Sequence, residues 1–282
     1  MDDYIPQNNI STLNNTVKNE SGTNNSLLDL FARFDSIPLE EMDNVKLMNR
    51  VDTKFLINSA HLPFLLNKAV VHYRIVEIDG HRISPYSTIY FDTDDADMYI
   101  MHHNGKLNRF KIRMRSYVNS KISFLEIKRK NNKGRTSKKR VEINADQFLS
   151  MTFSDDDNHF ITSKSPYIPA GLKPQLQNFF QRITLVDKNL TERVTLDTSL
   201  VYKDLANGMD KSVDGLVIVE MKQDGACKSY FKEYLNELKI LPGSMSKYCL
   251  GMVLLNPDLK KNRFKKKLRI INKITNNNHG TI

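Results

Sequence analysis

A run of alternating charge constrains the fold of this chain more than any other feature of its sequence. In RFKIRMR the odd-numbered positions are Arg109, Lys111, Arg113 and Arg115, whereas the even-numbered ones are Phe, Ile and Met. Successive side chains of a β-strand point to opposite faces, so a strand here carries four cations on one face and three apolar side chains on the other. The segment therefore predicts a strand with one cationic and one apolar face.

Five other strand-like segments divide their residues in the same way. The charged residues that share a face are Asp52 with Lys54, Glu126 with Lys128, Arg140 with Glu142, Arg193 with Asp197, and Glu220 with Lys222. A single strand of this kind is usually the solvated face of an antiparallel sheet. Here Arg and Lys predominate, and two cations about 6 Å apart repel by roughly 3 kcal/mol at an effective dielectric constant of about 20. Together these faces predict a polyanion between facing strands, as inside a β-barrel with a polar interior.

Many strands joined by turns, with few helices, indicate an α+β antiparallel sheet or barrel and not a βαβ array. We expect strands at residues 54–57, 73–78, 86–91, 110–118, 122–128, 140–143, 183–185, 193–200 and 215–221, helices at 26–34, 94–103, 146–151, 230–241 and 246–255, and a loop at 154–164. The Asn-rich residues 1–25 indicate a disordered leader, residues 26–258 a single domain, and residues 259–282 a basic tail.

The net charge of +10 would ordinarily favour nucleic acid or a membrane surface as the partner. Eight cations of the 42 lie in the tail without an acid, and residues 1–25 carry −2, so residues 26–258 keep only +4. An anion site in the folded part must therefore come from the position of its cations. Cys227 and Cys249 form no metal-binding pattern, and no apolar run approaches the ~20 residues of a membrane span. These features predict a cytoplasmic protein.

Seven motifs, in this order, resemble the polyphosphate polymerase (VTC-type) domain family of the triphosphate tunnel metalloenzyme (CYTH-like) superfamily. They are RVDTKF at 50–55, STIYFDT at 87–93, KIRMRSY at 111–117, LEIK at 125–128, RVTLDT at 193–198, VEMK at 219–222 and SKY at 246–248. The resemblance implies a closed antiparallel β-tunnel with a basic interior and helices packed outside. It also implies transfer of the γ-phosphoryl group of ATP to a growing polyphosphate chain, with release of ADP and with Mn²⁺ or Mg²⁺ as the cofactor.

The resemblance assigns roles to particular residues. Those expected to contact the reacting phosphates are Lys54, Arg113, Arg115, Lys128, Arg193 and Lys222. We expect further substrate binding by Arg109, Lys111, Arg140, Arg182, Lys247 and Tyr248, and metal binding by Glu220 and Glu126. This set suits phosphoryl transfer, which requires positioning and charge neutralisation more than covalent chemistry from the protein. Arg presents a planar fork to phosphate oxygens, and Lys a point charge.

One departure from the superfamily pattern separates two activities. Hydrolytic members begin with Glu-x-Glu-x-Lys, whereas this chain has Arg50-Val-Asp52-Thr-Lys54, with a cation at the first acidic position. This favours a polymerase over a metal-dependent triphosphatase, which remains an alternative together with a non-catalytic sensor of polyphosphate or nucleotide. A nucleic-acid binder is a weaker hypothesis, because the chain has no Trp and no aromatic–basic interleaving for base stacking.

The basic tail leaves three interpretations open. It is a solvated end, an anchor to acidic lipid or to a partner, or a docking strip for polyphosphate; Leu268, Ile270 and Ile271 allow a short amphipathic helix there. The eukaryotic members of the family are attached to membrane-spanning segments that carry the polymer away. We therefore expect either a stand-alone enzyme or one served by a separate membrane protein, at the inner face of the membrane in the second case.

Overall fold

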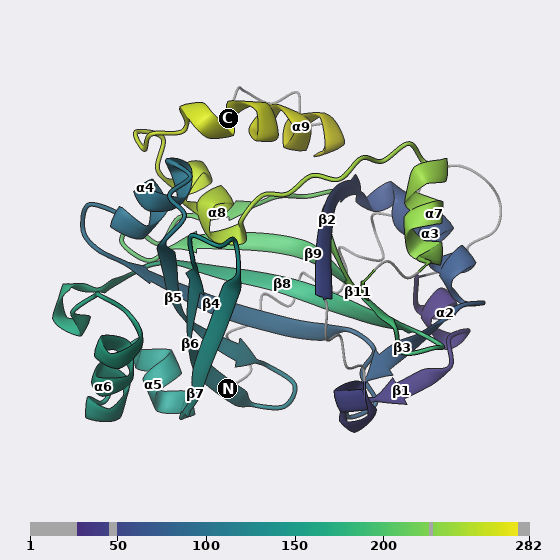
Figure 1. The fold of residues 1–282 in the computed structure, drawn as a ribbon, viewed down its shortest axis with the longest axis horizontal. Coiled ribbons are helices and arrows are strands. Elements are labelled where there is room, and N and C mark those ends of the chain that lie inside the picture. Colours follow the sequence, from purple (N-terminus) through teal and green to yellow (C-terminus); the bar gives the residue numbers. More distant parts are fainter. Residues whose placement is uncertain (1–26, 45–49, 226–227, 276–282) are drawn as a thin grey trace.

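An eleven-stranded, mostly antiparallel sheet forms the centre of the molecule (Figure 1), and eight of its strands follow one another in the order β2-β11-β9-β8-β4-β5-β6-β7. The computed structural model describes residues 27–44, 50–225 and 228–275, so the predicted leader lies outside the described residues. The strands are β1 (Ser36–Pro38), β2 (Arg50–Asn58), β3 (Tyr73–Glu77), β4 (Ser84–Asp92), β5 (Arg109–Tyr117), β6 (Ile122–Lys130), β7 (Thr136–Ile143), β8 (Lys173–Asp187), β9 (Glu192–Asp204), β10 (Asp210–Ser212) and β11 (Leu216–Asp224). The strands predicted from alternation are thus confirmed, several of them longer than expected.

The helices lie around the sheet. They are α2 (Leu27–Ala32), α3 (Leu62–Ala69), α4 (Asp97–His103), α5 (Ala145–Ser150), α6 (Asp155–Lys164), α7 (Tyr230–Glu237), α8 (Lys247–Leu255) and α9 (Lys265–Thr275), with short 3₁₀ turns at Leu39–Asn44, Ser59–His61, Pro169–Gly171 and Asn262–Phe264. Among the described helices, none combines the length and apolar character needed to cross a membrane.

The register of the sheet keeps each charged set on one face. Arg113 of β5 lies opposite Glu126 of β6 and opposite Tyr90 of β4, and Glu220 of β11 lies opposite Lys54 of β2. The side-chain period is two, so a slip of one residue would move every charge to the apolar face. We call the face that carries Arg113, Glu126 and Glu220 the inner face, and the opposite one the outer face.

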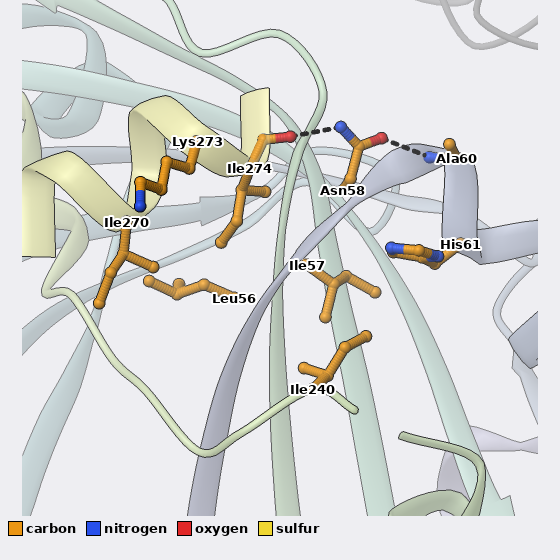
Figure 2. Close-up of a pocket in the computed structure, with 9 residues that line it drawn as sticks. All are labelled: Leu56, Ile57, Asn58, Ala60, His61, Ile240, Ile270, Lys273 and Ile274. Carbon is orange, nitrogen blue, oxygen red and sulfur yellow. Dashed lines mark hydrogen bonds between the residues drawn. The ribbon is translucent and has the colours of Figure 1, made fainter. Parts of the chain in front are cut away.

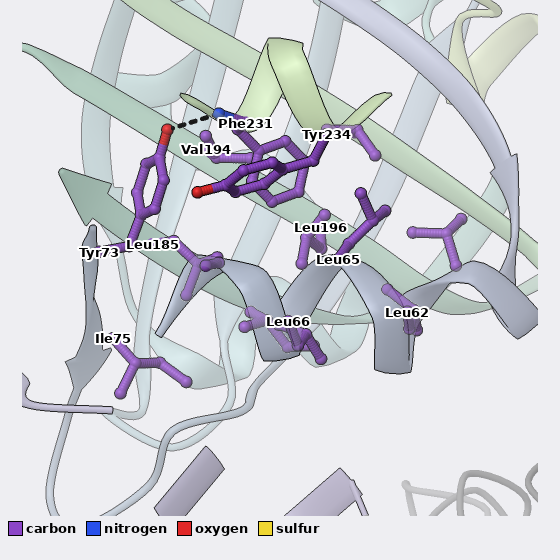
Figure 3. Close-up of a cluster of buried hydrophobic side chains, with 14 of the residues drawn as sticks. Leu62, Leu65, Leu66, Tyr73, Ile75, Leu185, Val194, Leu196, Phe231 and Tyr234 are labelled. Atoms are coloured by element: carbon purple, nitrogen blue, oxygen red, sulfur yellow. Dashed lines mark hydrogen bonds between the residues drawn. The ribbon is translucent and has the colours of Figure 1, made fainter. Parts of the chain in front are cut away.

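Two apolar clusters cover the outer face. Over β2, β11, β9 and β8, side chains such as Leu196 and Val219 pack against α2, α3 and α7 (Figure 3). Figure 3 also shows Tyr73 reaching the start of α7, where its hydroxyl accepts a hydrogen bond of 2.9 Å from the backbone N–H of Phe231. Over β4, β5 and β6, Ile112 and Leu125 belong to a second cluster together with residues of α5 and α6.

A third cluster closes one end of the inner face. It joins Tyr90 and Tyr202 of the sheet to Tyr248 of α8, and it includes residues of α4 and α9. Gly251 of α8 has no room for a side chain, because a Cβ there would lie 2.5 Å from the ring of Tyr202. This close approach places the start of α8 beside the cations of the sheet. Helices therefore cover part of the inner face as well as the outer one.

The structure corrects two expectations. The class is α+β with a large antiparallel sheet, as predicted, but the sheet is not closed, since β2 and β7 end the described order and do not pair with each other. The connection from α7 to α8 occupies part of the free edge of β2, where Gly243 donates a backbone hydrogen bond of 2.8 Å to Lys54. Residues 154–164, expected as a loop, form α6 because Ser154 and Asp157 make a reciprocal capping box at its start.

Candidate anion-binding site

The inner face gathers cations from seven strands of the sheet and from α8. Those on the strands or at the helix start are Lys54, Arg109, Lys111, Arg113, Arg115, Lys128, Lys138, Arg140, Arg182, Arg193, Lys222 and Lys247. Three carboxylates in contact with them, Glu126, Asp197 and Glu220, divide the face into three groups. In each group, the positive charges outnumber the negative ones.

The first group surrounds Glu126, which has no exposed surface. Arg113 donates from Nε and Nη2 to one carboxylate oxygen at 2.8 and 2.6 Å, and Lys138 donates to the other at 2.6 Å. Burial would raise the pKa of Glu126, but the charges of Arg113 and Arg115 hold it well below its usual range. Because Glu126 has no accessible surface at which a divalent ion could bind, its surroundings fit a buried counter-ion and not a metal ligand.

The second group surrounds Asp197 at the start of α8. Arg182 donates to its two oxygens at 2.6 and 2.8 Å in a bidentate pair, and Lys247 contacts one of them. Ser246 caps α8 by accepting from the backbone N–H of Cys249, which fixes where Lys247 enters the site. Burial lowers the pKa of Lys247 to about 8, although Asp197 opposes this shift.

The third group surrounds Glu220, the most exposed of the three carboxylates. Lys54 lies 2.5 Å and Lys222 3.2 Å from its oxygens, and 22% of its side chain is accessible. These cations keep the pKa of Glu220 below its usual range against the opposing effect of burial. An ionised, partly accessible carboxylate at the centre of a cationic face is able to hold a divalent ion together with phosphate oxygens.

Two other cations on this face, Arg115 and Lys111, bond to neutral groups. Arg115 donates to the hydroxyl of Thr88 at 3.1 Å, and Lys111 donates to the hydroxyl of Ser246 at 2.9 Å. The positive charge of Arg113, followed by burial, lowers the pKa of Lys128 to about 5. Glu220 opposes that shift although it lies on a different part of the sheet. The cations of the inner face therefore repel one another, and an anion bound among them would relieve that repulsion.

Two predicted site residues have other surroundings. The hydroxyl of Tyr248 donates to Asp92 inside the cluster under α8, and the side chain is buried. Arg140 of β7 stacks on Phe124, with its guanidinium carbon 4.3 Å from the ring centroid. The contacts of Tyr248 describe a support for α8, and those of Arg140 a position near the end of the sheet.

Sequence reasoning missed Lys138 and the part played by Asp197. Lys138 precedes Arg140 by two residues, so the alternation already placed it on the cationic face, and it faces Lys128 across β6 and β7. Asp197 was placed on the charged face of its strand, but its pairing with Lys247, 50 residues away, depends on where α8 packs.

A shallow apolar groove of about 510 Å³ lies apart from the cations (Figure 2). Leu56, Ile57 and Ile240 line it together with Ile270 and Ile274 of α9, and Lys273 reaches its rim. Figure 2 shows Asn58 of β2 bonded to the carbonyl of Ile274 at this groove. A surface so poor in charge is not suited to phosphate.

The fold and the site define a protein with an antiparallel sheet whose inner face is built to bind anions. Residues 49–256 match the family model described as the VTC domain. The chain belongs to the VTC domain family, and the resemblance found in its motifs is confirmed.

Solved structures also resemble this fold. They include a putative adenylate cyclase from Bacillus halodurans (14% identity, TM-score 0.47, 71% of this chain and 96% of that one) and a putative adenylyl cyclase from Hippeastrum described as having a dominant triphosphatase activity (13%, 0.44, 72% and 95%). The PH1012 protein from Pyrococcus horikoshii follows at 11% identity and a TM-score of 0.34, with 67% of this chain and 87% of that one covered. Comparison with curated proteins gives no match.

Proposed function

We propose that this protein is a polyphosphate polymerase that transfers the γ-phosphoryl group of ATP to the end of a polyphosphate chain. The observation that carries the proposal is the positive charge of Arg115 and Lys111, which bond to neutral groups, on an inner face that also holds Lys128 and Glu220. A chain of phosphates supplies the negative charge that these cations lack. Membership of the VTC domain family supports the same substrate class.

In the proposed reaction, a terminal oxygen of polyphosphate attacks the γ-phosphorus of ATP, and the bond from that phosphorus to the β,γ-bridging oxygen breaks. ADP leaves with that oxygen and its electron pair. The attacking oxygen is ionised at neutral pH, so no general base is required. Arg113, Arg115 and Lys128 lie on adjacent strands and would neutralise the transferring oxygens, which is the main catalytic requirement of phosphoryl transfer.

A divalent cation fits this site only if one carboxylate holds it and the phosphates and water supply the other ligands. Among the described residues no group of three or more His, Cys, Asp or Glu side chains could hold a metal, so an all-protein cage is absent from that part of the chain. Glu220 alone would hold Mg²⁺ or Mn²⁺, with phosphate oxygens and water as the other ligands, which is usual for Mg²⁺. The ion would neutralise charge on the phosphates. Glu126 and Asp197 would keep Arg113, Arg182 and Lys247 in place.

The test uses purified protein with ATP and Mn²⁺, with and without a short polyphosphate primer, and detects acid-insoluble polymer on a gel. Wild type is expected to make polymer, and Arg115→Gln to lose it about 100-fold or more, because an interaction with the transferring charge is removed. The matched control is Arg129→Gln, which makes the same change on the exposed outer side of β6 and is expected to keep full activity.

Each other outcome assigns a different function. Free phosphate without polymer would indicate a triphosphatase, with water as the acceptor. Binding of ATP or polyphosphate by folded protein without turnover would indicate a sensor, or an enzyme that lacks a separate membrane protein. Either result would overturn the stand-alone polymerase.

A further inference from the structure

The row of cations on β5 and β6 extends beyond the proposed reaction site. Arg109 pairs in register with Lys130 at the end of the row. Arg109 donates to the carbonyl of Lys106 at 2.7 Å, and Arg263 of the basic tail donates to the carbonyl of Asn104 at 2.6 Å. A guanidinium from the sheet and one from the tail thus meet on the short loop that follows α4.

Helix α9 adds a further cation beside its buried face. Lys267, Ile271 and Ile274 are spaced four and three residues apart, so they share one face of the helix. Ile271 is buried in the cluster that joins α9 to the sheet, and Ile274 packs against that cluster. Lys267 lies on one flank of this face and is exposed, whereas Lys265 and Arg269 lie toward the opposite flank of the helix.

An imidazole marks the point where these cations converge. His102 Nδ1 is buried and has no hydrogen-bond partner among the described residues. Burial, followed by the positive charges of Lys111, Arg109, Lys267 and Lys130, lowers the pKa of His102 to about 2. Side chains from β5, β6 and α9 therefore act on one location.

We infer that Arg109, Lys130, Arg263 and Lys267 form a second polyphosphate-binding subsite, in which the polymer lies beyond the reaction site. The inference rests on the proposed function, because the inner face supplies the polymer whose next units would occupy the subsite. Alternate residues of a strand are about 7 Å apart, so the row from Arg115 to Arg109 spans about 20 Å. Such a row suits a long chain of phosphates, and the subsite extends it beyond Lys111.

A membrane is the less suitable occupant of these four residues. A flat anionic surface would meet the exposed cations on both flanks of α9 alike, whereas Arg109 and Lys130 are only partly exposed and continue the row of the inner face, where a polymer leaving that face would reach them. The two sides of α9 therefore offer a matched pair of charge changes. Comparison of the two double variants distinguishes a specific binding site for the polymer from a general effect of positive charge.

The experiment measures binding of long-chain inorganic polyphosphate and of tripolyphosphate by calorimetry, in the full chain and without ATP. The double variant Arg263→Gln/Lys267→Gln is expected to bind long polyphosphate about tenfold more weakly, with a shallower salt dependence, and to bind tripolyphosphate as the wild type does. Lys265→Gln/Arg269→Gln is expected to change neither affinity. Lys267→Gln alone, which removes no hydrogen bond of the structure, keeps the test valid if loss of Arg263 disturbs the fold.

Equal losses in the two double variants would overturn the inference, because only total charge would then matter. An unchanged affinity for long polyphosphate in Arg263→Gln/Lys267→Gln would overturn it too. Selective loss of binding to vesicles of anionic phospholipid, with polyphosphate affinity retained, would assign these residues to a membrane instead. The assay requires no turnover, so a failure of the polymerase proposal in the gel assay remains a separate result.

Discussion

The two faces of the same strands contribute opposite terms to the stability of this protein. On the outer face of β9 and β11, Leu196 and Val219 are fully buried in an apolar cluster. One residue along each strand, on the inner face, Asp197 and Glu220 are ionised carboxylates bonded to cations. Burial of an apolar side chain stabilises a fold by about 1.5–3 kcal/mol, whereas burial of charge costs free energy that pairing offsets only in part.

This difference indicates what each face does. The outer face holds the sheet and its helices together, and its composition needs only to be apolar and well packed. The inner face includes cations that bond to neutral groups, such as Arg115 and Lys111, so it lowers stability until an anion binds. Such a trade between stability and function is common at binding sites. Four changes test the comparison.

The largest effect is expected for Arg113→Met. The variant leaves Glu126 buried with Lys138 as its one cationic partner, and removal of one member of a buried pair costs about 3–5 kcal/mol. Urea denaturation measures this loss. The double variant Arg113→Met/Glu126→Met removes the stranded charge and is expected to recover most of the stability while staying inactive. A double variant as unstable as the single one would contradict the counter-ion role of Glu126.

A somewhat smaller effect is expected for Leu196→Ala on the outer face. Truncation of a fully buried Leu leaves a cavity and costs about 2–5 kcal/mol. Polymer synthesis per folded molecule should stay unchanged, since no atom of Leu196 faces the cations. Denaturation gives the folded fraction, and the gel assay gives the activity at that fraction. An activity loss beyond the unfolded fraction would show that the two faces are not independent.

For Lys128→Met the comparison predicts a gain in stability, in contrast to the losses expected for Arg113→Met and Leu196→Ala. The variant removes an amine held among other cations, so the free energy of unfolding at pH 7 without anion is expected to rise by roughly 1–3 kcal/mol. Polyphosphate binding and activity are expected to fall. Denaturation and calorimetry on the same preparation test both changes, and a destabilised variant would show that Lys128 is well accommodated in the free protein.

Lys128 also makes the stability of the protein depend on pH. Its pKa is about 5 in the folded protein and near 10.5 when unperturbed, so the unfolded chain binds more protons between these values. The contribution of Lys128 to stability therefore rises with pH across that window. Anion binding should raise this pKa and cause proton uptake, which calorimetry in buffers of different ionisation enthalpy detects. Proton uptake at pH 7 is expected to decrease in Lys128→Met.

The smallest effect is expected at the protein surface between α3 and α7. Lys68 and Glu237 form an ion pair there, with 37% and 49% of their side chains exposed. Exposed pairs contribute less than about 1 kcal/mol, so Glu237→Gln should shift the urea midpoint only slightly and leave activity unchanged. A shift as large as that of Leu196→Ala would mean that surface charge, and not apolar packing, holds α7 in place.

Strand positions and their two faces could be predicted from residues alone. The alternation in Arg109–Arg115 gives both faces of β5 because the period of two is a local property of the backbone. The helical state of residues 154–164 could have been predicted from Ser154 and Asp157, the two members of the capping box. The open sheet was not predictable, because local pattern carries no information on whether β2 meets β7.

The sequence by itself determined where most strands lie, though not β1, β10 or most of β8, and it determined which side of each predicted strand is charged and the family to which the chain belongs. Only the tertiary structure decided how those charges combine. It brought Lys247 to Asp197 and Lys111 to Ser246, and it left Glu220 more accessible than Glu126. The physical reason is that a pairing energy and a pKa depend on distance and burial between segments far apart in the chain. Alternation fixes only the direction in which each side chain points.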